Sequence, residues 1–348
     1  MIITTRNLIH YCLAKQLVSP SSVVDGDFAV VDVSGRNRNY KVLRRSGPCY
    51  FVKQIQNWDA QAIAMLQCEA ACYWLPANDS NFSSLVPLTP DFFLYDPERQ
   101  VLITRLITKG EDLWEHFRHH GEINSEIAGK LGHLLGTYHA AGANSITESS
   151  HNAIFPRQLP WILSSARRNS HPFKQLSSAT AELFDYVEGS TPLREALDEI
   201  REEWKCSALM HGDLKLENCI LSGVAPELSI TIVDWELADI GDPCWDTGSI
   251  LQSFISVRLM SLPAPNKSGV NFDSLRSFWQ RYVRAIGTDS ETSLTLLQRC
   301  LRFAAARMIQ SAYEYMQFSP HLSANARCLL EVSESVLANP TGVALSIV

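Results

Sequence analysis

Two acids and one carboxamide within residues 209–246 are the residue types that phosphoryl transfer requires. Asp213 precedes Asn218 by five positions in a polar segment, and Asp234 follows the apolar run 229–233. Such a transfer needs an in-line hydroxyl, an acceptor for its proton, and metal ions that bridge the phosphates. Asp213 is the predicted proton acceptor. Asn218 and Asp234 are the predicted ligands of Mg²⁺, which prefers oxygen atoms and usually takes only one or two carboxylates.

These residues belong to two motifs that resemble the aminoglycoside phosphotransferase and choline kinase-like family, whose members are relatives of the protein kinases. The catalytic loop of that family reads His-Gly-Asp, four residues, then Asn, as the stretch from His211 to Asn218 does here. Its metal motif reads Asp, Trp or Phe, Glu, which begins here at Asp234, and a Gly-Asp-Pro run with a further Asp follows within 241–246. Both motifs, in this order and at this separation, are much more specific than either triplet alone.

The resemblance implies an α+β, two-lobed protein kinase-like fold. Residues 1–105 are the expected amino-terminal nucleotide-binding lobe, with a small antiparallel sheet. Residues 106–348 are the expected carboxy-terminal lobe, which is mostly helical and carries the catalytic loop and the acceptor site. The resemblance also implies ATP and Mg²⁺ as cofactors.

Lys53 stands among apolar residues in a predicted strand, 49–55, so its ammonium needs an anionic partner if it is buried. Glu69 lies on the apolar side of a predicted helix, 58–75, which is expected to end before Pro76. An ion pair between Lys53 and Glu69 satisfies both side chains. Kinase-like folds use such a pair to orient the nucleotide phosphates.

The loop 34–39 lies between two predicted strands, where a kinase-like fold keeps the loop that covers the phosphates. Gly35 is its only glycine, so the sequence has no glycine-rich fingerprint. The hydroxyl of Ser34 and backbone N–H groups are the expected phosphate donors, and Arg36 or Arg38 could add positive charge. An ordinary solvated hairpin is the alternative.

Two further strands are predicted at 92–95 and 101–106, and the second leads into the expected hinge between the lobes. By the resemblance, backbone groups of Thr104 and Leu106 bind the adenine. The residues themselves indicate only a strand that is followed by Gly110.

Beyond residue 106 the apolar residues recur at helical spacing. Helices are predicted at about 113–117, 127–142, 179–187, 193–204, 247–262, 272–286, 292–318 and 325–337. In the catalytic loop, Lys215 can place its ammonium over the transferring phosphoryl group. His211 and Asp246 are expected to brace this loop, and Glu236 is expected to be structural in preference to a metal ligand.

The acceptor stays open between three hypotheses. The favoured one is a hydroxyl of a small metabolite or antibiotic. A second is Ser or Thr of a peptide, since relatives in lanthipeptide biosynthesis resemble this layout and protein kinases commonly have a lysine where Lys215 stands. A third is a nucleotide-binding pseudokinase. Candidate acceptor contacts lie in the segment 143–205 and include Arg157, Trp161, Arg167 and Arg168.

Composition excludes several other classes of protein. A formal net charge of −7 opposes nucleic acid or an anionic membrane as a partner, because both require a clustered basic surface. The nine cysteines are scattered, without zinc-ligand spacing, and are expected to be reduced. No run of about eighteen apolar residues and no signal-peptide pattern occurs, so we expect a soluble cytoplasmic protein.

Overall fold

The computed structural model describes residues 1–145, 154–165, 172–224, 227–261 and 272–348. These residues form two compact units. The first comprises Met1–Glu111 and Cys219–Ala238, and the second comprises Asp112–Asn218 and Asp239–Val348. The division into a nucleotide-binding lobe and an acceptor lobe at residue 105 stays a prediction.

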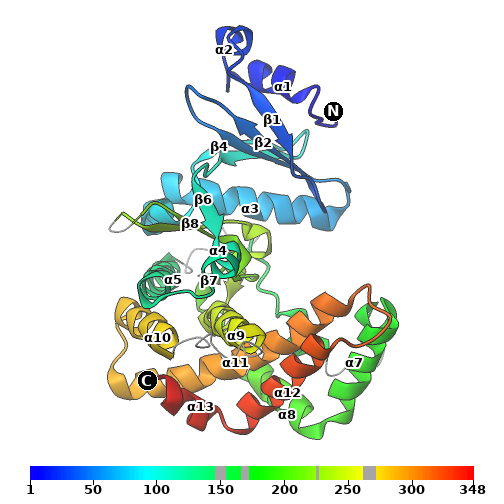
Figure 1. Cartoon of the computed structure of the whole chain (residues 1–348), viewed down its shortest axis with the longest axis vertical. Coiled ribbons are helices and arrows are strands. Elements are labelled where there is room, and N and C mark those ends of the chain that lie inside the picture. The colour runs from blue at the N-terminus through cyan, green and yellow to red at the C-terminus, as the bar shows by residue number, and fades with distance from the viewer. Residues whose placement is uncertain (146–153, 166–171, 225–226, 262–271) are drawn as a thin grey trace. The chain divides into compact units, whose positions relative to one another are not determined.

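A five-stranded antiparallel sheet forms the core of the first unit, in the strand order β1-β2-β3-β5-β4 (Figure 1). The predicted strands are all present. Their bounds are β1 Ala29–Asp32, β2 Arg38–Leu43, β3 Tyr50–Gln54, β4 Phe92–Asp96 and β5 Val101–Arg105. The strand β6, Gly110–Asp112, begins in the same unit, whose first segment ends at Glu111. This unit also holds the antiparallel pair of β8, Cys219–Ser222, and β9, Ser229–Ile232.

Alternation along β3 assigns its side chains to opposite faces of the sheet. Val52 is fully buried in a core that includes Leu8 and Tyr11 of helix α1, Leu8–Ala14. Lys53, the next residue, therefore points to the other face, where it meets Glu69 of helix α3, Ala60–Asn78. The period of the strand thus determines that the lysine faces α3 and not the apolar core.

The predicted end of helix α3 before Pro76 is wrong, because the helix continues through this proline to Asn78. Asp59 caps its first turn by accepting a hydrogen bond from the N–H of Ala62 at 2.8 Å. Pro76 lies in the last turn, where the loss of one N–H donor disturbs few helical bonds. The N–H of Asp79 donates to the carbonyl of Leu75 at 2.8 Å and closes that turn.

Prolines also begin two short helices that the sequence analysis does not predict. Helix α2, Pro20–Val24, follows α1 in the sequence and begins at its proline. Helix α13, Pro340–Ile347, lies close to the carboxyl terminus. Proline is favoured at the first helical position, since that N–H has no partner within the helix in any case.

The second unit is mostly helical, as predicted (Figure 1). Its two short strands, β7, Ala208–Met210, and β10, Asp239–Gly241, pair antiparallel. In the sequence, β7 comes directly before the catalytic motif, and β10 follows the metal motif. Its remaining helices are α4 Leu113–His120, α5 Ser125–Ser145, α6 Trp161–Ser165, α7 Ser178–Gly189, α8 Thr191–Glu202, α9 Pro243–Ser261, α10 Phe272–Ile286, α11 Ser290–Met316 and α12 Ala324–Ala338. Within the described ranges, no helix has the length and apolar character to cross a bilayer. All nine cysteines are free thiols.

Candidate active site

The catalytic loop follows β7 in the second unit and is braced by the buried carboxylate of Asp246. This carboxylate accepts hydrogen bonds from the backbone N–H groups of His211 at 2.6 Å and Gly212 at 3.0 Å. The indole of Trp245 donates to the carbonyl of Gly212 at 2.8 Å. Gly212 has a φ of 83°, a conformation in which a residue with a Cβ would be strained. The bracing role predicted for Asp246 is therefore confirmed.

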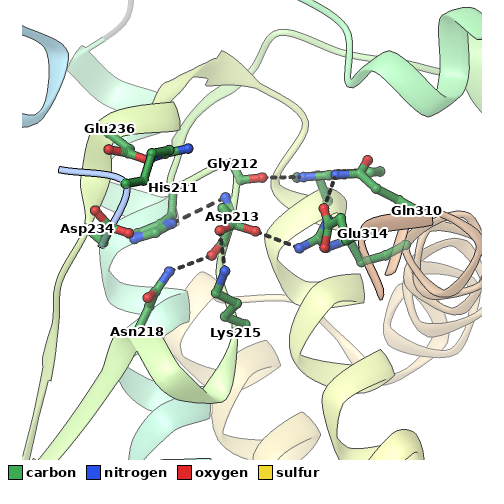
Figure 2. Close-up of polar contacts among 12 residues, drawn as sticks. His211, Gly212, Asp213, Lys215, Asn218, Asp234, Glu236, Gln310 and Glu314 are labelled. Atoms are coloured by element: carbon green, nitrogen blue, oxygen red, sulfur yellow. Dashed lines mark hydrogen bonds and ion pairs between the residues drawn. The ribbon is translucent and has the colours of Figure 1, made fainter. Parts of the chain in front are cut away.

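The carboxylate of Asp213 is held between two cations of the same unit (Figure 2). Its Oδ2 lies 2.7 Å from Nζ of Lys215, and its Oδ1 lies 2.6 Å from Nη2 of Arg307 in helix α11. Asn218 donates from its side-chain amide to the carbonyl of Asp213 at 2.9 Å, which closes the loop between the two predicted site residues. The roles of Asp213 as base and of Lys215 in the transition state stay predictions.

In the first unit, Lys53 is buried among three carboxylates. Its Nζ lies 2.7 Å from Glu69, 2.6 Å from Asp234 and 2.9 Å from Glu236. The ion pair predicted between Lys53 and Glu69 is confirmed. Burial by itself would lower the pKa of Lys53, but the negative charges of Glu69 and Asp234 outweigh it, so the pKa is raised and the ammonium stays charged.

Tyr73 links the ion pair to the backbone of the metal motif. Its hydroxyl donates to Oε1 of Glu69 at 3.1 Å and accepts from the N–H of Asp234 at 2.9 Å. Asp234 has a φ of 67° and a ψ of 53°, in the left-handed region that residues other than glycine rarely adopt. Strained backbone of this kind is concentrated at functional sites, where surrounding contacts hold it in place.

Glu236 forms two ion pairs in the first unit that the sequence does not predict. One of its carboxylate oxygens contacts Lys53, and the other forms an ion pair with Arg36 of the loop 34–39. Arg36, Lys53 and Glu236 also line a cavity of about 230 Å³ together with residues of helix α3. The sequence marks Glu236 only as the third residue of the metal motif and does not indicate its contact with Lys53.

The donor set of the first unit suits Mg²⁺. Carboxylate oxygens of Glu69, Asp234 and Glu236 all lie within 4.8 Å of one another. Oxygen atoms of this type are the ligands that Mg²⁺ prefers. Asn218 belongs to the second unit and Asp234 to the first. Their joint role as metal ligands therefore stays a prediction.

The other predicted nucleotide contacts take part in local hydrogen bonds. The hydroxyl of Ser34 accepts from the N–H of Asn39 at 3.1 Å within its hairpin. The N–H of Gly35 donates to the carbonyl of Asn37 at 3.0 Å, and the N–H of Leu106 donates to the carbonyl of Cys49 at 3.0 Å. Binding of phosphate or adenine by these groups requires exchange of the existing bonds.

Thr104 lies within β5, where it pairs with Phe51 of β3 and with Phe92 of β4. Its side chain is buried in the sheet. The contact that the resemblance implies between adenine and the backbone of Thr104 stays a prediction, as do those of Leu106, Ser34 and Gly35.

The candidate acceptor contacts stay predictions. Arg167 and Arg168 lie outside the described residues. The ring of Trp161 packs edge-on against that of Tyr313, with 5.3 Å between the ring centroids. The backbone N–H of Arg157 donates a hydrogen bond to Oδ1 of Asp239 at 2.8 Å. Among the aromatic residues of helices α10 and α11, Trp279, Tyr282 and Tyr313 are buried in the core, whereas Tyr315 is 55% exposed.

Arg307 was missed by the sequence analysis. It lies in the apolar stretch 303–309 of helix α11, where its immediate neighbours are Ala306 and Met308. A lone charge in such a stretch needs a partner, which is the reasoning that identified Lys53. An arginine flanked by apolar residues at position 307 is therefore a sequence signal for a buried ion pair.

Comparison with known proteins identifies the family of this chain. The model of the phosphotransferase enzyme family matches residues 33–266, more than half of the chain, so the chain belongs to this family. No curated protein sequence is significantly similar to it.

Three solved structures illustrate the likeness. One is an ethanolamine kinase from Plasmodium vivax, with a TM-score of 0.60, 16% identity, and coverage of 100% of this chain and 92% of that chain. A macrolide 2′-phosphotransferase from Brachybacterium faecium has a TM-score of 0.51 and 14% identity, with 95% and 98% covered. The GDP complex of an aminoglycoside 2′-phosphotransferase has a TM-score of 0.54 and 15% identity, with 98% and 99% covered. The fold is therefore the α+β kinase-like fold of these phosphotransferases.

Proposed function

We propose that this protein transfers the γ-phosphoryl group of ATP to a hydroxyl of a small metabolite or antibiotic, in a reaction that depends on Mg²⁺. The observation that carries the proposal is the carboxylate of Asp213, which a braced loop holds in a chain of the phosphotransferase family. The names of two similar structures, an ethanolamine kinase and a macrolide phosphotransferase, support small-molecule acceptors.

In the proposed reaction, Asp213 takes the proton of the acceptor hydroxyl as its oxygen attacks the γ-phosphorus. The bond from the γ-phosphorus to the bridging oxygen breaks, and ADP leaves with that electron pair. Lys53, held by Glu69, orients the phosphates, and Lys215 offsets charge on the transferring group. When bound, Mg²⁺ supplies positive charge that stabilises the phosphates, with Asn218 and Asp234 as its proposed ligands.

The nucleotide contacts follow the same proposal. Backbone groups at Thr104 and Leu106 bind the adenine, while Ser34 and the N–H of Gly35 bind phosphate. Arg36 can then exchange Glu236 for a phosphate oxygen, because its side chain is largely exposed.

The Asp213→Asn variant tests the proposed base. Turnover should fall by about 10²- to 10⁴-fold, the usual contribution of a general base, while nucleotide binding is retained. Labelled ATP and Mg²⁺ are supplied with pools of metabolites, antibiotics and peptides, and transfer is counted for each pool. Asp273→Asn, which removes an exposed acid of helix α10, is the control. Full phosphotransfer by Asp213→Asn would contradict the assigned role.

The same assay separates the alternatives. Transfer to the peptide pool alone would replace the small-molecule acceptor with Ser or Thr. Nucleotide binding without transfer or hydrolysis would indicate a pseudokinase. Asp234→Asn should weaken nucleotide binding in Mg²⁺ but leave binding in EDTA unchanged, since its proposed role is to hold the metal.

A further inference from the structure

Arg307 joins two carboxylates from within helix α11. Its Nη2 lies 2.6 Å from Oδ1 of Asp213, and its Nη1 lies 2.9 Å from Oε1 of Glu314. Gln310 donates to the same oxygen of Glu314 at 3.0 Å, which fixes the outer carboxylate (Figure 2). Only 2% of the arginine side chain is exposed. The guanidinium is therefore held at both ends and has little room to move.

The planar guanidinium suits this position. Its donors have a rigid geometry that matches two acceptors at once, and the group stays charged at any pH at which a protein is folded. A buried cation in an apolar helix is costly unless its partners are well placed. One of the two partners of Arg307 is Asp213, the residue proposed as the catalytic base.

The two oxygens of Asp213 are held in different ways. Oδ1 accepts from the buried guanidinium of Arg307, whereas Oδ2 contacts the ammonium of Lys215. The side chain of Lys215 is 38% exposed, and a lysine carries its charge on a flexible four-carbon chain. Of the two cations, Lys215 can leave Asp213 at the smaller cost, because solvent can replace its contact.

We propose that Arg307 is a positioning residue, which fixes the carboxylate of Asp213 through Oδ1 and leaves Oδ2 as the atom that takes the acceptor proton. The inference rests on the proposed function. Nζ of Lys215 moves from Oδ2 toward the transferring phosphoryl group, and the acceptor hydroxyl takes its place. The hydroxyl proton passes to Oδ2 while the acceptor oxygen bonds to the γ-phosphorus and ADP leaves.

This arrangement has a kinetic consequence. When Oδ1 is held, the carboxylate cannot turn to follow Lys215, so departure of the ammonium exposes a correctly oriented Oδ2. Without the guanidinium fork, the carboxylate can rotate and stay paired with Lys215. Loss of the fork should therefore lower kcat, because small displacements of a catalytic group are costly to the rate, and should leave the KM for ATP unchanged.

The test compares Arg307→Lys with Arg302→Met in the same helix. Arg307→Lys keeps the charge but loses the fork, so kcat should fall about ten-fold with the KM for ATP unchanged. Glu314→Gln, which loosens the outer end of Arg307, should lower kcat in the same direction by less. Arg302 pairs with Glu199 and Glu203, outside the proposed site, and its loss should leave kcat at the wild-type value.

Thermal unfolding and ATP binding establish that each variant is folded before its kinetics are compared. If folded Arg307→Lys and Glu314→Gln both turn over at the wild-type rate while Asp213→Asn is inactive, the inference is wrong and the proposed function stands. If Asp213→Asn is itself fully active, the proposed base is wrong and the inference falls with it. A fall in kcat for Arg307→Lys, absent in Arg302→Met, supports the inference.

Discussion

At the scale of single residues, the ammonium of Lys53 offsets the charge of a carboxylate cluster in the first unit. Lys53 separates the carboxylates of Glu69, Asp234 and Glu236, whose oxygens lie within 4.8 Å of one another. Like charges at this spacing repel strongly in a buried site. Arg36 contacts Glu236 from an exposed position and offsets only part of this charge. The lysine thus has a structural role in addition to its proposed contact with phosphate.

Replacement of Lys53 by Met should destabilise the protein and create a dependence on Mg²⁺. Removal of one partner from a buried ion pair typically costs about 3–5 kcal/mol. A divalent cation can occupy the carboxylate cluster and restore part of the loss, since a ligand that binds only the folded state stabilises it. The melting temperature, measured in EDTA and in millimolar Mg²⁺, should rise more for Lys53→Met than for the wild type.

The control for that measurement is Lys41→Met, which removes an exposed lysine from β2 of the same sheet. Its response to Mg²⁺ should equal that of the wild type. An equal response by Lys53→Met would show that the three carboxylates do not form a cation site in its absence.

At the scale of elements, Asp96 at the end of β4 joins helix α1 to the sheet. Its Oδ2 accepts from the hydroxyl of Tyr11 at 3.0 Å and lies 2.8 Å from Nζ of Lys15. Arg99 adds a backbone and a side-chain hydrogen bond. Burial by itself would raise the pKa of Asp96, but the bonds from Lys15, Tyr11 and Arg99 outweigh it and lower the pKa to about 2.

Acid should therefore weaken this connection in a defined range. A carboxylate whose pKa is lowered by folding stabilises the protein above its unfolded pKa, about 4, and the stabilisation is lost as the pH falls toward 2. Asp96→Asn should lower the free energy of unfolding at pH 7 by about 1–2 kcal/mol and flatten its pH dependence below pH 4. Urea unfolding across this range measures both effects.

Asp91→Asn is the matched control for Asp96→Asn. Asp91 pairs with Arg105 in an exposed position, where an ion pair contributes about 0–1 kcal/mol. A pH dependence that is identical in Asp96→Asn and the wild type would contradict the assigned role of Asp96.

At the scale of the whole molecule, the helical unit depends on close contact between α5 and α10. Gly129, Gly132 and Gly136 lie along α5 at the surface that meets α10. A Cβ on Gly132 would lie 2.1 Å from the backbone carbonyl oxygen of Phe278, and backbone cannot move aside as a side chain can. These glycines set the distance between the two helices.

Gly132→Ala should accordingly destabilise the protein by about 1–3 kcal/mol or more, the cost of forcing extra atoms into a packed interface. Gly189→Ala in helix α7 is the control, because a Cβ there meets no atom within 4 Å. That variant should be neutral or more stable, since alanine favours a helix over glycine by about 1 kcal/mol. Calorimetric melting distinguishes the two, and equal melting temperatures would show that α10 can move away.

The sequence by itself determined the class of protein and most of its elements. The motifs around Asp213 and Asp234 are short and contiguous, so their chemistry can be read without knowledge of packing. Alternation and helical spacing predicted the five strands and the long helices, because these periods reflect which face is buried. The pair of Lys53 and Glu69 was predictable because each is a charge in an apolar setting.

Only the tertiary structure decided which distant residues meet the motifs. Glu236 contacts Lys53 across 183 positions, and Arg307 contacts Asp213 across 94. A single sequence does not record such contacts, since they depend on how helices and strands pack after they form. The continuation of α3 through Pro76 was likewise not evident from the sequence, because a proline usually ends a helix. Local chemistry was thus encoded in neighbouring residues, and its electrostatic environment was fixed by packing.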